Sequence, residues 1–377
     1  MRKDQEYWYL ITKELLNKAG IEINGSRDWD IKIINPLFFK KVICSGSLGL
    51  GESYMDGWWE CSRIDELVYR LLYHNMEKQL PRNLVDTLRV LAARLINRQS
   101  RKRAKTVARK HYDLGNKFFS IVLDPYMQYS CAYWQNSQDL AQAQEEKLHL
   151  ICRKLELQPG MTLLDIGCGW GGLAEFAARF YGVSVFGVTI SAEQKKFAEQ
   201  RCAGLDVTIS LQDYRDITSR FDRIVSVGMF EHVGQKNYPV FFSTVNRSLK
   251  PGGIFLLHTI GSNISKINSD AFLNKYIFPN ATLPSISQLM LASEPYFIME
   301  DLHSFGPQYD KTLLAWHAHF IDNWADIERI SERYDERFKR MFTFYLSSCA
   351  GAFRARHMQL WQIIFSRGIV GSVTVIR

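Results

Sequence analysis

The chain has 377 residues, and its 47 Lys and Arg outnumber its 39 Asp and Glu, which gives a formal net charge of +8 at pH 7. With 46% hydrophobic and 23% charged residues the composition is globular, which excludes a disordered or collagen-like chain and allows two domains. No apolar run reaches the roughly 18 residues of a membrane-spanning helix. The N-terminus lacks a signal-peptide pattern, and the seven cysteines lack metal-ligand spacing, so we expect a cytoplasmic protein with reduced thiols and no metal. The positive charge fits nucleic acid, an anionic membrane or an acidic substrate equally well.

The first part of the chain, residues 1–97, is predicted to form a small, mainly helical domain. Its leucines between Leu84 and Leu95 recur at helical spacing, which favours a helix packed on its own domain over a membrane-surface helix. The stretch Gly46–Glu60 mixes glycines with large aromatics and is predicted to be a buried turn, with a lipid-facing loop as the alternative. Residues 98–110 carry seven positive charges and are interpreted as a basic linker, with contact to phospholipid headgroups or nucleic-acid phosphates left open.

Strands and helices alternate from about Leu150, which predicts a mostly parallel sheet within a catalytic domain spanning residues 111–377. Apolar strands are predicted in MTLLDI, VSVFGVTIS, DVTISL, RIVSVG and GGIFLLHTIG, and helices in LAEFAARFYG and AEQKKFAEQRCAG. The tail from about Trp316 is predicted to be helical.

A glycine-rich loop follows the first of these strands, in the sequence DIGCGWGG. Ligands bind at the carboxyl ends of the strands in such sheets, and Gly167, Gly169 and Gly171 let the backbone turn tightly and approach a ligand. The loop lacks the Gly-Lys-Ser/Thr of a phosphate-binding loop, and its glycine spacing fits a dinucleotide site poorly.

This arrangement resembles the Rossmann-like fold of class I S-adenosylmethionine (SAM)-dependent methyltransferases, with a mostly parallel seven-stranded sheet. The resemblance implies SAM contacts along the glycine loop and at the ends of the neighbouring strands. The second strand ends in VTISAEQ, without the acidic residue that many such enzymes place there, so Thr189 and Gln194 are expected to supply neutral hydrogen bonds. Asp213, next to Gln212, is expected to contact adenine, with a helix cap or turn as the alternative. The predicted cofactor-binding residues are Tyr112, Tyr129, Ser130, Asp165, Gly167, Cys168, Gly169, Gly171, Thr189, Gln194, Gln212 and Asp213.

Seven motifs carry a closer resemblance, to the family of cyclopropane-fatty-acyl-phospholipid synthases over nearly the full chain. They are SLGLGESYMDGWWE, HYDLGN, MQYSCAYW, LDIGCGWGG, VTISAEQ, SVGMFEHVG and CAGAFRAR. The resemblance implies methyl transfer from SAM to a cis double bond of a phospholipid acyl chain, followed by ring closure. It also implies that Tyr112 closes over SAM and that Tyr129 and Ser130 lie near the methionine carboxylate.

Ring closure requires a base, and the resemblance implies that a bound bicarbonate provides it. Glu231 is expected to accept the bicarbonate O–H, and His258 to donate to its anionic oxygens. Cys131, Tyr309 and the Ile260 backbone complete the cage in the family pattern. Each side chain has a plainer alternative: a cap for Glu231, a core histidine for His258 and a small buried hydrophobe for Cys131. Cys349 is a candidate nucleophile with no neighbouring histidine in the sequence to serve as its base.

Two other classes of function stay open: a basic RNA or DNA methyltransferase on the same fold, and a non-catalytic lipid-binding protein. The position after the fourth strand reads MFEH rather than the Asn/Asp-Pro-Pro-aromatic motif of base-amine methylation, and the predicted Glu231, His258 and Tyr309 argue against a non-catalytic protein. A relative that makes methyl-branched or hydroxylated chains is a third possibility. We expect no nucleic-acid partner, peripheral binding to the inner membrane through positive charge, and a homodimer, the last on the resemblance alone.

Overall fold

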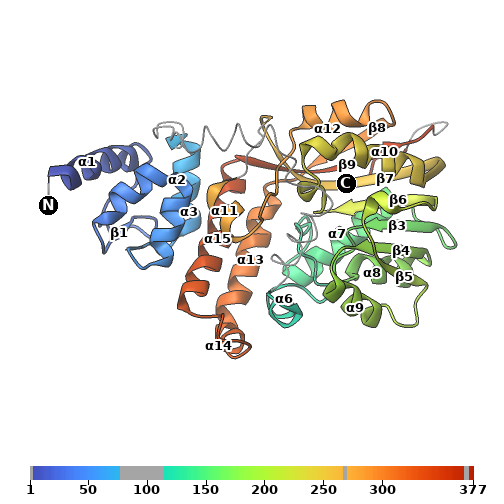
Figure 1. The fold of residues 1–377 in the computed structure, drawn as a ribbon, viewed down its shortest axis with the longest axis horizontal. Coiled ribbons are helices and arrows are strands. Elements are labelled where there is room, and N and C mark those ends of the chain that lie inside the picture. The colour runs from blue at the N-terminus through green and yellow to red at the C-terminus, as the bar shows by residue number, and fades with distance from the viewer. Residues whose placement is uncertain (1–2, 77–113, 266–269, 369–372) are drawn as a thin grey trace. The chain divides into compact units, whose positions relative to one another are not determined.

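The computed structural model describes residues 3–76, 114–265, 270–368 and 373–377. The chain divides into two compact units, which are considered separately here (Figure 1). The first comprises Met1–Ile96, Ile267–Pro279 and Tyr309–Met358, and the second Asn97–Lys266, Asn280–Gln308 and Gln359–Arg377. The first unit thus takes in two segments that the sequence analysis assigned to the catalytic domain. The basic linker and the leucine stripe lie outside the described residues, so the predicted domain boundaries stay predictions.

A seven-stranded sheet forms the centre of the second unit, with the strand order β5-β4-β3-β6-β7-β9-β8. Strands β3 to β7 pair in parallel along β5-β4-β3-β6-β7, and β8 pairs antiparallel with β9. Their bounds are β3 Thr162–Ile166, β4 Ser184–Thr189, β5 Val207–Leu211, β6 Phe221–Val227, β7 Leu249–Ser262, β8 Ile298–Ser304 and β9 Met358–Ser366. The predicted Rossmann-like sheet is therefore confirmed. The prediction of a helical tail is wrong at β9, where the apolar run LWQIIF is buried as a strand between β7 and the edge.

Helices cover both faces of this sheet. Successive strand residues point to opposite faces, and apolar side chains on each face pack against helices. Leu163 packs with α7 and α8 on one face, and its neighbour Leu164 packs with α10 and α12 on the other. Both residues are fully buried, which explains the unbroken apolar run in β3. The helices of the unit are α6 Asn116–Val122, α7 Leu140–Lys154, α8 Gly172–Tyr181, α9 Ala192–Arg201, α10 Tyr238–Ser248 and α12 Ile286–Ser293, with 3-10 turns η2 Tyr214–Asp216, η3 Phe230–His232 and η4 Gln235–Asn237.

The first unit is mainly helical in its described part. Its elements are α1 Lys3–Lys18, β1 Lys32–Ile33, α2 Leu37–Met55, β2 Trp59–Glu60, α3 Ile64–Tyr73, α11 Ala271–Tyr276, α13 Gln308–Asp322, α14 Trp324–Glu328 and α15 Glu336–Arg354. Within the stretch Gly46–Glu60, residues Gly51–Met55 are buried, but the stretch is not the predicted turn: α2 continues through it to Met55, with a kink at Gly46 where φ is 54°. Trp59 is fully buried and donates to the Ser53 hydroxyl at 3.0 Å.

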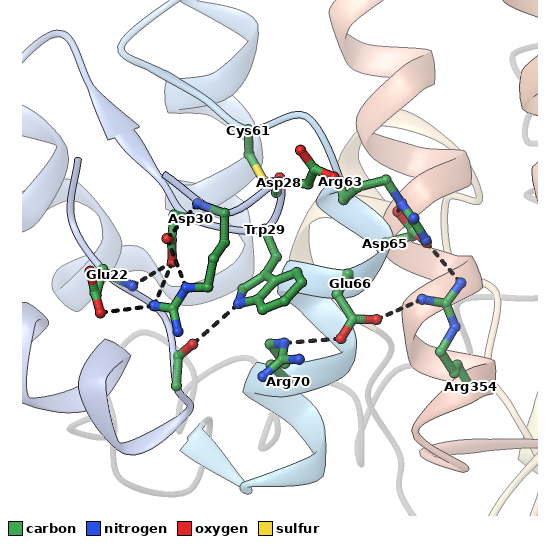
Figure 2. Close-up of polar contacts among 12 residues, drawn as sticks. Glu22, Asp28, Trp29, Asp30, Cys61, Arg63, Asp65, Glu66, Arg70 and Arg354 are labelled. Carbon is green, nitrogen blue, oxygen red and sulfur yellow. Dashed lines mark hydrogen bonds and ion pairs between the residues drawn. The ribbon is translucent and has the colours of Figure 1, made fainter. Parts of the chain in front are cut away.

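The CAGAFRAR motif has a structural function in this unit. A Cβ on Gly351 would lie 2.3 Å from the Asp65 carbonyl oxygen, so only glycine lets α15 approach α3 this closely. Three residues later, Arg354 donates to Asp65 at 2.7 Å and to Glu66 at 3.1 Å (Figure 2). It also donates to Asp310 at 2.9 Å. The motif therefore joins α15 to α3 by close packing and by one shared arginine.

Asp65 depends on these cations because only 4% of its surface is exposed. Burial alone would raise the pKa of this carboxyl, but hydrogen bonds from Arg63 and Arg354 outweigh burial and lower its pKa to about 2. The carboxylate therefore stabilises the folded unit above about pH 4, and that contribution is lost as the pH falls toward 2.

We predict that Arg354→Met lowers the free energy of unfolding by about 2–4 kcal/mol at pH 7, because it removes one partner of a buried ion pair. Urea denaturation followed by circular dichroism measures this. Arg329→Met, which breaks an exposed pair with Asp326, is the matched control and should leave the midpoint nearly unchanged. Equal midpoints for Arg354→Met and the control would contradict the prediction.

Candidate active site

The glycine loop lies where the sequence predicts it, between the end of β3 and the start of α8. Gly167 has a φ of +87°, and a Cβ there would lie 2.7 Å from the Met229 side chain. Gly169 has a φ of +54° and open space where its Cβ would be. The Cys168 amide donates to the Val188 carbonyl at 3.1 Å, which ties the loop to β4. The loop therefore presents bare backbone at the carboxyl edge of the sheet.

Asp165, near the end of β3, contains a carboxylate oxygen without a partner. The residue is 2% exposed, and its Oδ2 is buried without a hydrogen bond among the described residues. Burial raises the pKa of Asp165 to about 7, although the charge of Lys147 acts in the opposite direction. A buried acceptor of this kind fits a cationic group of a ligand.

The predicted residues after β4 and β5 are held close to one another. The Thr189 hydroxyl donates to Gln194 Oε1 at 3.0 Å, and the Gln212 amide donates to the Thr189 carbonyl at 3.0 Å. Asp213 caps η2, and its carboxylate accepts from the Arg215 guanidinium at 2.7 Å and 2.5 Å. The capping alternative for Asp213 is thus present in the structure, and its contact with adenine stays a prediction.

The segment before the sheet contains the consecutive residues Tyr129, Ser130 and Cys131. Tyr129 packs its ring against Phe119 at 5.2 Å, and Cys131 is fully buried with its thiol donating to the Ala132 carbonyl at 3.3 Å. Tyr112 lies outside the described residues.

Glu231 lies at the same edge of the sheet, in η3 just after β6. Its Oε1 accepts the backbone N–H of Ile260 at 2.6 Å. Its Oε2 is buried without a partner among the described residues. Burial raises the pKa of Glu231 to about 7, and the bond from Ile260 only partly offsets this. The predicted capping alternative does not apply to its carboxylate, and the Ile260 amide serves to hold Glu231.

His258 lies on β7 beside the end of β6, paired in register with Val227. The Gln362 amide nitrogen lies 3.3 Å from its Nδ1. With this amide assigned as the donor, Nδ1 accepts and the tautomer with its proton on Nε2 follows. His258 is 1% exposed, and burial together with the charges of Lys147 and Lys154 lowers its pKa well below the usual range. The ring is therefore neutral, and its Nε2 is buried and without a partner among the described residues.

One buried aromatic side chain borders this histidine, and a second packs against the first. Phe305, which is 3% exposed, meets the His258 ring edge to face at 5.7 Å, and Tyr133 meets Phe305 at 5.5 Å. The Phe305 ring therefore covers one side of His258.

Tyr309 and Cys349 belong to the other compact unit, so their place in the site stays a prediction. Tyr309 stacks on Phe353 at 4.5 Å. Cys349 lies within α15, where burial raises the pKa of its thiol and disfavours the nucleophilic thiolate.

Sequence reasoning missed two residues of this region, Gln362 and Lys147. Gln362 follows Trp361 within the apolar run of β9, and no spacing marks it as a partner of His258. Lys147 does leave a signal, because it interrupts the buried face of α7 four residues after Ala143.

The buried carboxyl of Glu231 generates a pH-dependent prediction. Its pKa rises from 4.5 to about 7 on folding, so its contribution to stability is complete below pH 4.5 and is lost as the pH rises toward 7. We predict that Glu231→Gln raises the melting temperature relative to the original chain at pH 8 by several degrees more than at pH 5. Differential scanning calorimetry measures both values, with the exposed replacement Glu294→Gln as the control. If the melting temperatures of Glu231→Gln and the original chain differed by the same amount at pH 5 and pH 8, the prediction would be contradicted.

Comparison with known proteins identifies the family. The family model described as mycolic acid cyclopropane synthetase matches residues 99–363. The cyclopropane-fatty-acyl-phospholipid synthase of Escherichia coli (strain K12) is 60% identical over 98% of this chain and 96% of its own length.

Solved structures agree with this assignment. The cyclopropane synthase MmaA2 from Mycobacterium tuberculosis gives a TM-score of 0.65 at 31% identity, covering 70% of this chain and 98% of that one. The mycolic acid cyclopropane synthase CmaA1 complexed with SAH and CTAB gives a TM-score of 0.64 at 35% identity, again covering 70% of this chain and 98% of that one. The resemblance carried by the seven motifs is thereby confirmed. The chain belongs to the mycolic acid cyclopropane synthetase family and is a SAM-dependent methyltransferase.

Proposed function

We propose that this enzyme transfers a methylene group from SAM to the cis double bond of an unsaturated phospholipid acyl chain and forms a cyclopropane ring. The observation that carries the proposal is the pair of buried polar atoms without partners, Glu231 Oε2 and His258 Nε2, at the edge of the sheet that also holds the glycine loop. The 60% identity to the Escherichia coli enzyme of that name supports the substrate class. Membership of an enzyme family argues against the non-catalytic alternative.

The residues of the cofactor edge fit SAM. The bare backbone of Gly167 and Gly169 leaves room for the cofactor, and the Asp165 oxygen without a partner suits its ammonium group. Thr189 and Gln194 offer neutral hydrogen bonds to the ribose in place of an acid. The chemistry that SAM supplies is an electrophilic methyl group on a sulfonium.

The acyl chain imposes strict demands on the site. An alkene is a weak, neutral nucleophile, so the methyl must lie in line with it. Attack of the alkene on the methyl group forms a carbon–carbon bond and breaks the sulfur–methyl bond. It leaves a carbocation on the acyl chain, which water would trap. Loss of a proton from the new methyl group closes the ring. The buried rings of Phe305 and Tyr133 exclude water and present π-faces suited to a cation.

Bicarbonate is the base that best fits the pair of atoms without partners. When bound, it would supply the acceptor for the methyl proton. The Glu231 carboxylate would accept its O–H, and the neutral His258 would donate from Nε2 to an anionic oxygen. The Ile260 amide keeps Glu231 in place. Cys131 and Tyr309 are further members of the cage by resemblance.

Membrane contact is proposed to be peripheral and electrostatic. Within the described part of the chain no helix is long and apolar enough to cross a bilayer. The net charge of +8 would hold the enzyme on anionic headgroups, and this attraction weakens with salt. The homodimer stays a proposal based on the family, and an equilibrium sedimentation mass of one chain would contradict it.

The first test concerns the base. We predict that turnover falls in bicarbonate-depleted buffer and recovers when bicarbonate is added back. Glu231→Gln and His258→Ala should each lower kcat by about 10²–10⁴, because each removes a group that holds the base. Affinity for S-adenosylhomocysteine, measured by calorimetry, should stay unchanged in both variants. Full turnover by both variants without added bicarbonate would contradict the assignment.

The second test concerns the product and the surface. The enzyme is incubated with labelled SAM and either vesicles of monounsaturated phospholipid or tRNA. We expect lipid that has gained one CH₂ and lost its alkene, formed faster on anionic vesicles at low salt. Labelled tRNA with unchanged lipid would favour a nucleic-acid methyltransferase. Equal rates on neutral and anionic vesicles at every salt concentration would contradict the proposal that electrostatic attraction holds the enzyme on the membrane.

A further inference from the structure

Two polar side chains of α7 are fully buried one helical turn apart and contact the same segment of the second unit. Gln144 donates from its amide to the Ser130 carbonyl at 2.9 Å and to the Gln128 carbonyl at 3.2 Å. Lys147 donates from Nζ to Gln128 Oε1 at 2.8 Å and to the Ser130 hydroxyl oxygen at 2.9 Å. The segment before the cofactor edge is therefore fixed through both its backbone and its side chains.

A fully buried lysine in this position is not explained by packing. The neighbours of Lys147 on α7, Leu148 and Ile151, belong to the apolar core against α8 and the sheet. Burial lowers the pKa of Lys147 to about 8, while the carboxylates of Asp124 and Asp165 favour its charged form. An apolar side chain of similar length would stabilise such a core at least as well. The lysine therefore points to a role in the site.

The bond between Lys147 and Ser130 determines which way the serine hydroxyl donates. An ammonium group donates hydrogen bonds and accepts none, so the Ser130 oxygen must be the acceptor of this bond. The hydroxyl hydrogen of Ser130 then remains available for another acceptor. A hydroxyl whose oxygen accepts from a cation is also a stronger donor. Ser130 is thereby prepared to bind an anion.

We propose that Lys147 is a positioning residue for the amino-acid end of SAM, holding the Ser130 hydroxyl toward the methionine carboxylate and placing positive charge behind it. This rests on the proposed binding of SAM and on the family resemblance, which implies that Ser130 lies near the methionine carboxylate. The Asp165 oxygen without a partner complements it as the acceptor for the ammonium group of the same zwitterion.

The same helix offers a matched control. Lys154 lies seven residues after Lys147, is 1% exposed and is also a lysine in a buried environment. Its Nζ lies 3.0 Å from His303 Nδ1 and 3.9 Å from Asp301, and among the described residues it makes no hydrogen bond or ion pair with the Ser130 segment. Lys154→Met therefore removes a buried cation from α7 without touching the proposed carboxylate site.

Two nucleoside probes test the proposal by isothermal calorimetry. S-Adenosylhomocysteine carries the amino-acid end, and 5′-methylthioadenosine lacks it. We expect Lys147→Met to weaken S-adenosylhomocysteine binding about tenfold or more, because a charge-assisted hydrogen bond is lost, and to leave methylthioadenosine binding unchanged. Ser130→Ala should have the same selective effect, and the double variant should lose little more than either single one. Lys154→Met should keep the ratio of the two affinities.

Several outcomes would overturn the proposal. They are an unchanged affinity ratio in Lys147→Met, an equal loss for both probes, and fully additive losses in the double variant. If Lys147→Met does not fold, Lys147→Gln, which also removes the charge, replaces it. The same ratio of affinities for S-adenosylhomocysteine and methylthioadenosine is then measured for Lys147→Gln. The test uses binding alone, so it stands even if the product assay shows that the acceptor is not a phospholipid.

Discussion

The parallel pairing of β6 with β7 is the constraint on which the site depends. Its register sets Val227 beside His258, so the turn that follows β6 and the last residues of β7 meet at one edge. Glu231 reaches across this edge to the Ile260 amide at 2.6 Å. A sheet with another register would separate these groups, because a shift of one residue turns every side chain to the opposite face.

In the described part of the chain, three polar side chains near this edge are buried without full hydrogen bonding. Buried polar atoms in folded proteins are nearly always hydrogen-bonded, and each atom without a partner destabilises the fold. Asp165, Glu231 and His258 each carry such an atom here, all in the second unit. In the first unit, by comparison, Arg354 forms ion pairs with the carboxylates of Asp65, Glu66 and Asp310. Among the described residues, buried atoms without a partner are not confined to the second unit, since His317 Nε2 is one in the first; those of Asp165, Glu231 and His258 matter because they lie near the carboxyl ends of β3, β6 and β7.

Much of the second unit could be predicted because its signals are local. The apolar run of β3, the glycines after it and the helix that follows lie within twenty consecutive residues, and β3 is buried on both faces. The predictions that failed concern segments whose structure depends on residues far away in the sequence. The apolar run of β9 becomes a strand between β7 and β8, and α2 continues as a helix past its kink at Gly46. Gln362 acquires its role from His258, more than a hundred residues away, and Lys147 from Ser130.

The central claim is that the transferred methyl group loses one proton to a base at this edge. Methyl-deuterated SAM tests it most directly, with mass spectrometry of the modified acyl chain. The account predicts a saturated ring that retains two of the three deuterons, because the third leaves with the base. A product that retains all three, as a methyl-branched or hydroxylated chain would, contradicts it.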